Sequence, residues 1–210
     1  MDNLIYILFV AIFVPILLMT CLVEEKARHP LVFVLIGIFV SVFAGEVNGV
    51  MVDLLPLSTF EITIIVTPIS EEILKAIPIL FFATILSPKK EAVFTAAMAI
   101  GIGFAVLENA FYMLNDASFN MIDAIVRAFG AGLRHGMCTL LVGVGILFVK
   151  KKRKLFVVGT FAMLSTAITY HGIYNMLVQS DYQIIGYLLP IATYIPFMVW
   201  RIRKIRQKKS

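Results

Sequence analysis

The chain has 210 residues, of which 60% are hydrophobic and 15% are charged. A soluble domain carries about 25% charged residues, and its core cannot absorb this much apolar surface. The composition therefore excludes an ordinary soluble domain and predicts an integral membrane protein. The net charge of +5 does not call for nucleic acid as a partner, because basic loops beside anionic lipid headgroups explain it.

Apolar runs long enough to cross a bilayer, about 20 residues each, recur along the chain with short connections between them. We expect an all-α, polytopic transmembrane helix bundle that forms one domain over residues 1–210. The seven expected spans cover approximately residues 3–23, 31–52, 61–86, 92–114, 122–149, 155–178 and 183–200. The N-terminus lacks the positive segment of a cleavable signal peptide, and the first apolar run is long enough to span.

The charged residues in the connections alternate in sign. Fifteen of the 18 Lys and Arg residues follow the first, third, fifth and last spans, as Lys26 and Arg28, Lys89 and Lys90, the KKKRK run at 150–154, and the tail from Arg201. The other connections hold Asp53, Glu61, Asp116 and Asp181. The positive-inside rule then predicts an outside N-terminus and a cytoplasmic C-terminus beside anionic lipid. We expect a multi-pass protein of a bacterial cell membrane.

Several ionisable residues fall inside the expected spans. A charge at the bilayer centre costs at least about 2.5–3.5 kcal/mol, so such residues face the bundle interior or a wet cavity and predict a functional site. Three of them are assigned to packing, pairing or the interface: Arg127 and Arg134 in the fifth span, and Glu46 near the outer end of the second. The remaining candidates are Glu71, Glu72 and Lys75 in the third span, Glu108 in the fourth, His135 in the fifth and His171 in the sixth.

These candidates are expected at overlapping depths. With a rise of about 1.5 Å per residue, Glu71 lies roughly 15 Å from the outer surface, Glu108 and His171 about 10 Å, and His135 about 20 Å. Helical spacing also places residues on shared faces. The pairs on one face are Glu71 with Lys75, Glu72 with Lys75, His171 with Asn175, and Phe104 with Glu108, which Asn109 follows.

Carboxylates and imidazoles in a cavity of low dielectric constant suit general acid–base chemistry. A Glu can take a proton from water, and a His or an Asn can hydrogen-bond a developing oxyanion. The pattern predicts a hydrolase that activates water, without a Ser-His-Asp set. Cys138 is three residues from His135 and could serve as a thiol nucleophile, but a small packing residue is the favoured interpretation.

Other functions use the same residue types. Glu71, Glu108, His135 and His171 can supply zinc ligands, although no HExxH helix is present. A proton-coupled transporter also relies on buried Glu and His, but it usually shows internal repeats or broken helices. No repeat is visible, and Pro68 and Pro78 are the residues that can distort the third span. A third alternative is that the charged groups only fix helix packing.

Four motifs follow one another on successive spans: SEEILK, GFAVLENAFYM, LRHGMCTLLVG and YHGIYNML. In this order, from about Pro68 to Asn175, they resemble the PrsW family of membrane proteases, which belongs with the CAAX-processing and bacteriocin-immunity-type glutamic proteases. The resemblance implies a membrane-embedded glutamic endopeptidase that needs no cofactor, with zinc as the alternative. It also implies a membrane-tethered substrate similar to an anti-sigma factor. A non-catalytic immunity or binding protein on the same scaffold is the remaining alternative.

The resemblance also implies roles for single residues. Glu71 and Glu72 match the paired glutamates, and Glu71 is expected to be the base. Glu108 and His135 match the motifs of the next two spans. His171 matches the last histidine and is a candidate oxyanion ligand. Asn175 stands where PrsW sequences often have Asp, so its role is open, while Lys75 is expected to pair with a glutamate.

Overall fold

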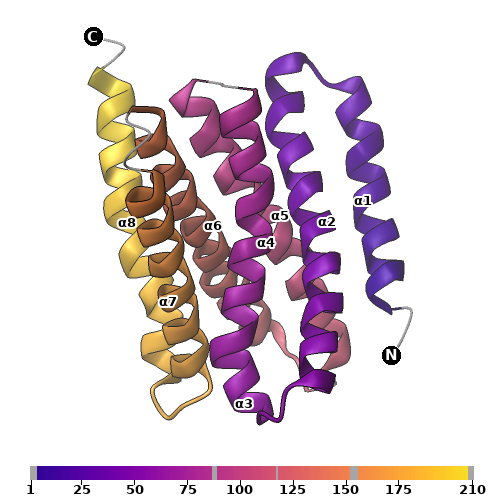
Figure 1. The fold of residues 1–210 in the computed structure, drawn as a ribbon. Helices are drawn as coiled ribbons and strands as arrows, with labels where there is room; N and C mark the ends of the chain where they lie inside the picture. The colour runs from indigo at the N-terminus through magenta and orange to yellow at the C-terminus, as the bar shows by residue number, and fades with distance from the viewer. Residues whose placement is uncertain (1–3, 87–88, 117, 152–155, 208–210) are drawn as a thin grey trace.

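The computed structural model describes residues 4–86, 89–116, 118–151 and 156–207. Helices make up nearly all of these ranges, and no strand occurs in them, which confirms the predicted all-α bundle (Figure 1). The elements are α1 (Leu4–Leu22), α2 (Glu25–Leu54), α3 (Thr59–Glu61), η1 (Ile62–Val66), α4 (Thr67–Ile85), α5 (Lys90–Asn115), α6 (Met121–Lys151), η3 (Phe156–Thr160), α7 (Phe161–Val178) and α8 (Gln183–Gln207).

Each predicted span coincides with a helical segment, because α3, η1 and α4 follow one another without a break, as do η3 and α7. By length and composition, four helices in the described chain are able to cross a membrane: α1, α2, α5 and α6, the last up to Leu147. The chain is therefore a multi-pass membrane protein. That α4, α7 and α8 also cross, for a total of seven spans, stays a prediction.

Three of the basic connections lie at one end of the bundle. The α1–α2 turn, the end of α4 with the start of α5, and the end of α8 are all at the top of Figure 1, opposite the N-terminus. Of the KKKRK run, residues 152–154 lie outside the described part of the chain, as do residues 208–210 of the tail. The side of the membrane that this end faces stays a prediction from the positive-inside rule.

The segment that leads into the SEEILK motif is irregular for a reason that the sequence contains. The Ser58 hydroxyl accepts a bond from the backbone N–H of Glu61, whose carboxylate accepts from Ser58 in return, so that a capping box begins α3. The chain then continues as the π-helix η1, in which Thr67 N–H donates to the Ile62 carbonyl five residues earlier. The next such bond, from residue 68 to Thr63, is impossible because Pro68 has no N–H.

Helix α5 packs between α2 and α6. A Cβ on Gly37 of α2 would collide with the Ile100 carbonyl of α5, and one on Gly103 of α5 would collide with the Val34 carbonyl of α2. The two helix backbones are therefore in contact, which only glycine allows at these positions.

The apolar core occupies the half of the bundle nearer the basic connections. Its members include Ile79 and Ala83 of α4, Val93 and Ile100 of α5, and Val142 of α6. The buried charged residues lie in the other half of the same helices, closer to the opposite end.

Candidate active site

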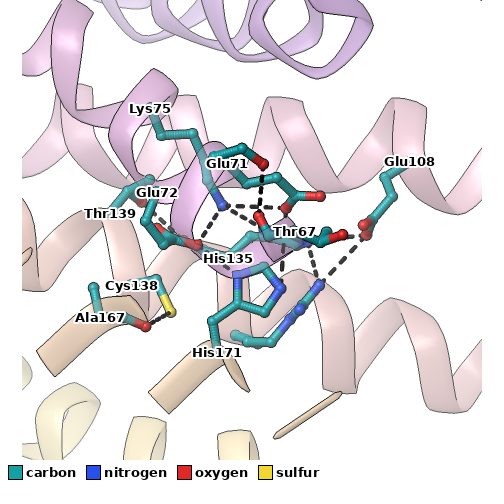
Figure 2. A network of polar contacts seen from close by, with 12 residues as sticks. Thr67, Glu71, Glu72, Lys75, Glu108, His135, Cys138, Thr139, Ala167 and His171 are labelled. Carbon is teal, nitrogen blue, oxygen red and sulfur yellow. Dashed lines mark hydrogen bonds and ion pairs between the residues drawn. The ribbon is translucent and has the colours of Figure 1, made fainter. Parts of the chain in front are cut away.

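Four helices contribute ionisable side chains to one buried layer, as the sequence predicts (Figure 2). Most of these side chains are almost fully enclosed, and only Glu108 is partly exposed, at 15% of its side chain. The layer contains Glu71, Glu72 and Lys75 from α4, Glu108 from α5, Arg134 and His135 from α6, and His171 and Asn175 from α7. Because it is a single connected network, each member is best described by its partners.

Glu72 connects α4 to α7. Its Oε1 accepts a hydrogen bond from Lys75 Nζ at 2.6 Å and another from His171 Nδ1 at 2.8 Å. Both partners lie on the apolar interior side of the helices, where an uncompensated charge would be costly. Glu72 therefore balances the Lys75 ammonium and fixes the orientation of the His171 ring.

Lys75 also reaches the neighbouring helix. Its Nζ lies 2.8 Å from His135 Nδ1, and the ring of Phe104 lies below the ammonium, 4.4 Å from Nζ to the ring centroid. The predicted pairing of Lys75 with glutamate is confirmed for Glu72, whereas Glu71 Oε2 is 3.9 Å away. The Phe104 ring also packs against the His135 ring in a tilted arrangement, with the centroids 4.8 Å apart.

His135 has a second set of contacts through Nε2. The Glu108 carboxylate lies 2.9 Å from this atom and the Arg134 guanidinium 2.5 Å from it. Arg134 Nη2 is also 3.5 Å from Glu108 Oε2. Glu108 thus receives an imidazole and a buried guanidinium, and this pairing role of Arg134 agrees with its assignment from the sequence.

Glu71 is held on one side only. Its Oε1 accepts a hydrogen bond of 3.5 Å from the Asn48 side chain on α2, and the Asn48 carbonyl oxygen accepts one from Ser70. Its Oε2 is buried and has no hydrogen-bond partner among the described residues, and the same is true of His171 Nε2. These two atoms are 4.0 Å apart, so two buried polar atoms without hydrogen-bond partners in the described chain lie next to each other.

Asn175 links the irregular segment η1 to Arg134. Its amide nitrogen donates to the Thr63 carbonyl at 2.9 Å, and its amide oxygen accepts from Arg134 Nη1 at 2.8 Å. The Thr63 carbonyl has no backbone N–H from the next turn, because Thr67 bonds Ile62 and Pro68 has no N–H. It is therefore available to the Asn175 side chain. The helix irregularity therefore supplies the anchor that orients Asn175, and Asn175 in turn orients Arg134.

The partly exposed side of the layer is formed by α5 and α6. Arg127, which is 27% exposed at its side chain, approaches Glu108 Oε2 at 3.7 Å and stacks on the Tyr112 ring at 3.9 Å. Asn109 donates to the Arg127 backbone carbonyl at 3.4 Å. Asn109 thus joins the two helices near the site but makes no bond to its carboxylates in the described structure.

Sequence reasoning missed Asn48 and Ser70, and it gave Arg134 no place in the site. Asn48 lies in the second span, which carries none of the four motifs. The available signal was its position near the outer end of α2, at a depth similar to that of the layer. Glu46, its neighbour, instead accepts a hydrogen bond from the Tyr6 hydroxyl at 2.7 Å on the exposed side of α2. Cys138 is buried, and its thiol donates to the Ala167 carbonyl at 3.5 Å, in agreement with a packing role.

Residues 25–201 match the sequence profile described as PrsW family intramembrane metalloprotease. The chain belongs to the PrsW family. It is therefore a membrane-embedded protease, a hydrolase that acts on peptide bonds of a protein substrate. No curated protein and no solved structure matches the chain. Helix α1 precedes the matched residues, whereas all four motifs of this PrsW protein lie inside them.

The family description implies a metal ion, and the residues of the PrsW layer can be tested against it. Glu71, Glu108 and His135 each offer a ligand atom, all within 4.8 Å of one another. Glu71 Oε2 and His171 Nε2 are also buried without hydrogen-bond partners in the described chain. Carboxylate oxygens and imidazole nitrogens are ligands that Zn²⁺ accepts. The donor set therefore fits a divalent cation, although the Arg134 guanidinium occupies the same cluster.

Proposed function

We propose that this protein is an intramembrane endopeptidase that cleaves a membrane-anchored protein with a water molecule activated by Glu71. One observation carries this proposal: the Oε2 atom of Glu71 and the Nε2 atom of His171 are both buried, both without hydrogen-bond partners in the described chain, and 4.0 Å apart. One water oxygen can lie about 2.8 Å from each of them. A water held there has two acceptors and no competing solvent.

In the proposed reaction Glu71 takes a proton from this water as its oxygen attacks the carbonyl carbon of the peptide. A C–O bond forms, and the carbonyl becomes an oxyanion. Glu71 then returns the proton to the amide nitrogen, and the C–N bond breaks. General base catalysis of this kind contributes about 10²–10⁴-fold to the rate.

The other residues of the layer are proposed to support these steps. Glu72 holds the His171 ring in place through Nδ1, so that Nε2 of His171 accepts a hydrogen bond from the water beside Glu71. An amide nitrogen carries two hydrogens, and the Thr63 carbonyl uses one of those on Asn175, which leaves an N–H for the oxyanion. The buried Arg134 guanidinium and Lys75 ammonium supply positive charge within the layer, where no bulk water screens it.

A metal-dependent reaction is the second candidate, favoured by the cluster of ligand atoms and by the family description. Glu71, Glu108 and His135 would hold the cation. When bound, it would polarise a carbonyl or acidify a water. In this case Glu71 is a ligand instead of a base, and Arg134 lies beside a second positive charge.

The resemblance and the position of the layer support a proposal for the substrate class. We propose a single-span protein similar to a membrane-tethered anti-sigma factor, cut on the outer side of a bacterial plasma membrane. The predicted topology supports the outer side, since the layer lies in the half of the bundle away from the basic connections.

The test is cleavage of a panel of tethered anti-sigma factors by purified protein in detergent, with and without a chelator. Wild type, Glu71→Gln and Glu46→Gln are compared, because Glu46 undergoes the same change on the exposed side of α2. Cleavage that persists in chelator and is lost only in Glu71→Gln supports the glutamate base. Cleavage that chelator abolishes and Zn²⁺ restores supports the second candidate. Equal cleavage by all three proteins removes Glu71 from the reaction.

A further inference from the structure

The two buried histidines of the layer have different hydrogen-bond environments. His171 faces the Glu72 carboxylate through Nδ1 at 2.8 Å, and its Nε2 has no hydrogen-bond partner in the described structure. His135 faces the Lys75 ammonium through Nδ1 at 2.8 Å and the Glu108 carboxylate through Nε2 at 2.9 Å. The same ring nitrogen therefore meets an acceptor in one histidine and a donor in the other.

We propose that Lys75 is a positioning residue that gives His135 the tautomer opposite to that of His171, with the proton on Nε2 in His135 and on Nδ1 in His171. A carboxylate only accepts and an ammonium only donates. Next to Glu72, Nδ1 of His171 must carry the hydrogen. Next to Lys75, Nδ1 of His135 must present its lone pair, and the ring proton then lies on Nε2, toward Glu108.

The Arg134 guanidinium is the one neighbour that opposes this assignment, because it also only donates and lies 2.5 Å from His135 Nε2. The other tautomer would satisfy Arg134 but would turn an N–H toward the Lys75 ammonium and leave the Glu108 carboxylate without its imidazole donor. Arg134 keeps Asn175 as an acceptor at 2.8 Å in either case. Two satisfied contacts against one favour the proton on Nε2.

The assignment divides the roles of the two rings in the proposed function, on which this part of the inference rests. His171 presents a free lone pair at Nε2, suited to accept from water or to bind a cation. His135 presents an N–H at Nε2 and is a donor. A cation held by Nε2 of His135 would first have to displace that proton, whereas one held by Nε2 of His171 would not.

The tautomers can be measured without any substrate, so the result is independent of whether cleavage is found. The chain has only 3 histidines, and the third, His29, packs against the rings of Phe33 and Phe82 on the far side of the core. Full-length protein labelled with ¹⁵N-histidine in lipid bilayers is examined by solid-state NMR, with His29→Gln, His135→Gln and His171→Gln used to assign the signals. Protonated and unprotonated ring nitrogens resonate far apart.

In the wild type we expect an unprotonated Nδ1 for His135 and an unprotonated Nε2 for His171. Lys75→Met removes the donor that faces His135 Nδ1 and should change the His135 signals, and Glu72→Gln removes the carboxylate that faces His171 Nδ1 and should change those of His171. A protonated Nδ1 on His135 in the wild type overturns the proposal, as does a His135 spectrum that Lys75→Met does not alter. Because the wild-type spectrum already decides the assignment, a variant that fails to fold does not leave the proposal untested.

Discussion

Helices α1 and α6 show opposite relations between hydropathy and burial. The mean hydropathy of the most apolar stretch is 2.8 in α1 and 1.3 in α6, yet 6% of that stretch is buried in α1 and 72% in α6. In a soluble protein the more apolar helix would be the buried one. Here lipid surrounds the outer helix, so apolar side chains lie outside and the polar ones gather where other helices shield them.

The contrast between the lipid-facing helix α1 and the buried helix α6 indicates where substitutions are tolerated. Association of helices in lipid depends on close packing and on polar contacts rather than on hydrophobicity. Substitutions in the interior of α4, α5 and α6 should therefore have large effects, and those on α1 small ones.

The largest expected effect is on the buried ion pair of α4. Glu72→Ala removes the carboxylate that lies 2.6 Å from Lys75 Nζ and leaves a buried ammonium without its nearest partner. Loss of one member of such a pair costs about 3–5 kcal/mol. We expect a large drop in the free energy of unfolding in detergent, measured by SDS titration. Glu46→Ala on the exposed side of α2 is the control, and equal stability of the two variants would contradict the interior assignment of Glu72.

Next in size is the contact between α2 and α5. Gly103→Ala places a methyl group against the Val34 backbone, and overpacking of this kind costs about 1–3 kcal/mol. Gly132→Ala on α6 is matched to it, since a Cβ there meets nothing within 4 Å. Because Ala favours helix more than Gly by about 1 kcal/mol, we expect the two variants to change the thermal unfolding temperature in opposite directions. A stabilised Gly103→Ala would show that the two helices separate readily.

A smaller effect is expected from Asn48. Asn48→Ala removes the hydrogen bond to Glu71 and the one that Ser70 donates to Asn48. Each is worth about 0.5–1.5 kcal/mol, and loss of the bond that orients Glu71 corresponds to a loss of up to about tenfold in cleavage rate. The free energy of unfolding should fall by less than in Glu72→Ala, and this separates the residue from the ion pair. The control is Asn115→Ala, whose side chain donates within its own helix, to the Phe111 carbonyl at 2.8 Å. Full activity of Asn48→Ala would mean that Glu71 is oriented by other contacts.

The smallest effect is predicted for the lipid-facing surface of α1. Val10 is 56% exposed and Val142 of α6 is 0% exposed, so the same Val→Ala change can be made in both places. We expect Val10→Ala to alter the free energy of unfolding by less than about 0.5 kcal/mol and Val142→Ala to lower it by about 1–3 kcal/mol through the cavity it leaves. Equal losses at both positions would place α1 inside a larger assembly.

The helices could be located from the sequence, but not their full lengths. The second span was expected from residue 31, whereas α2 begins at Glu25, and α8 continues to Gln207, beyond the expected residue 200. Hydropathy marks the lipid boundary, and backbone hydrogen bonding continues past it into charged sequence. For the π-helix η1, the sequence signal was Pro68, which indicates that the helix is distorted but does not specify the geometry of the distortion.

The site could be predicted as a layer but not as a network. Spacing within one helix indicated that Lys75 pairs with a glutamate, because both lie on one helical face. The partners on other helices, such as Glu72 with His171 and Asn175 with Thr63, depend on helix rotation and crossing. The residue spacing within one helix does not specify how that helix is rotated or how it crosses its neighbours. Asn48 was missed for the same reason, since its partner is on another helix.

The contact of α2 and α5 through Gly37 and Gly103 also has a consequence for access to the buried layer. Where two backbones touch, no extended peptide and no lipid chain can pass between the helices. A segment that approached the layer through the bilayer would therefore have to enter between other helices. The two glycines thus close one route into the interior of the bundle.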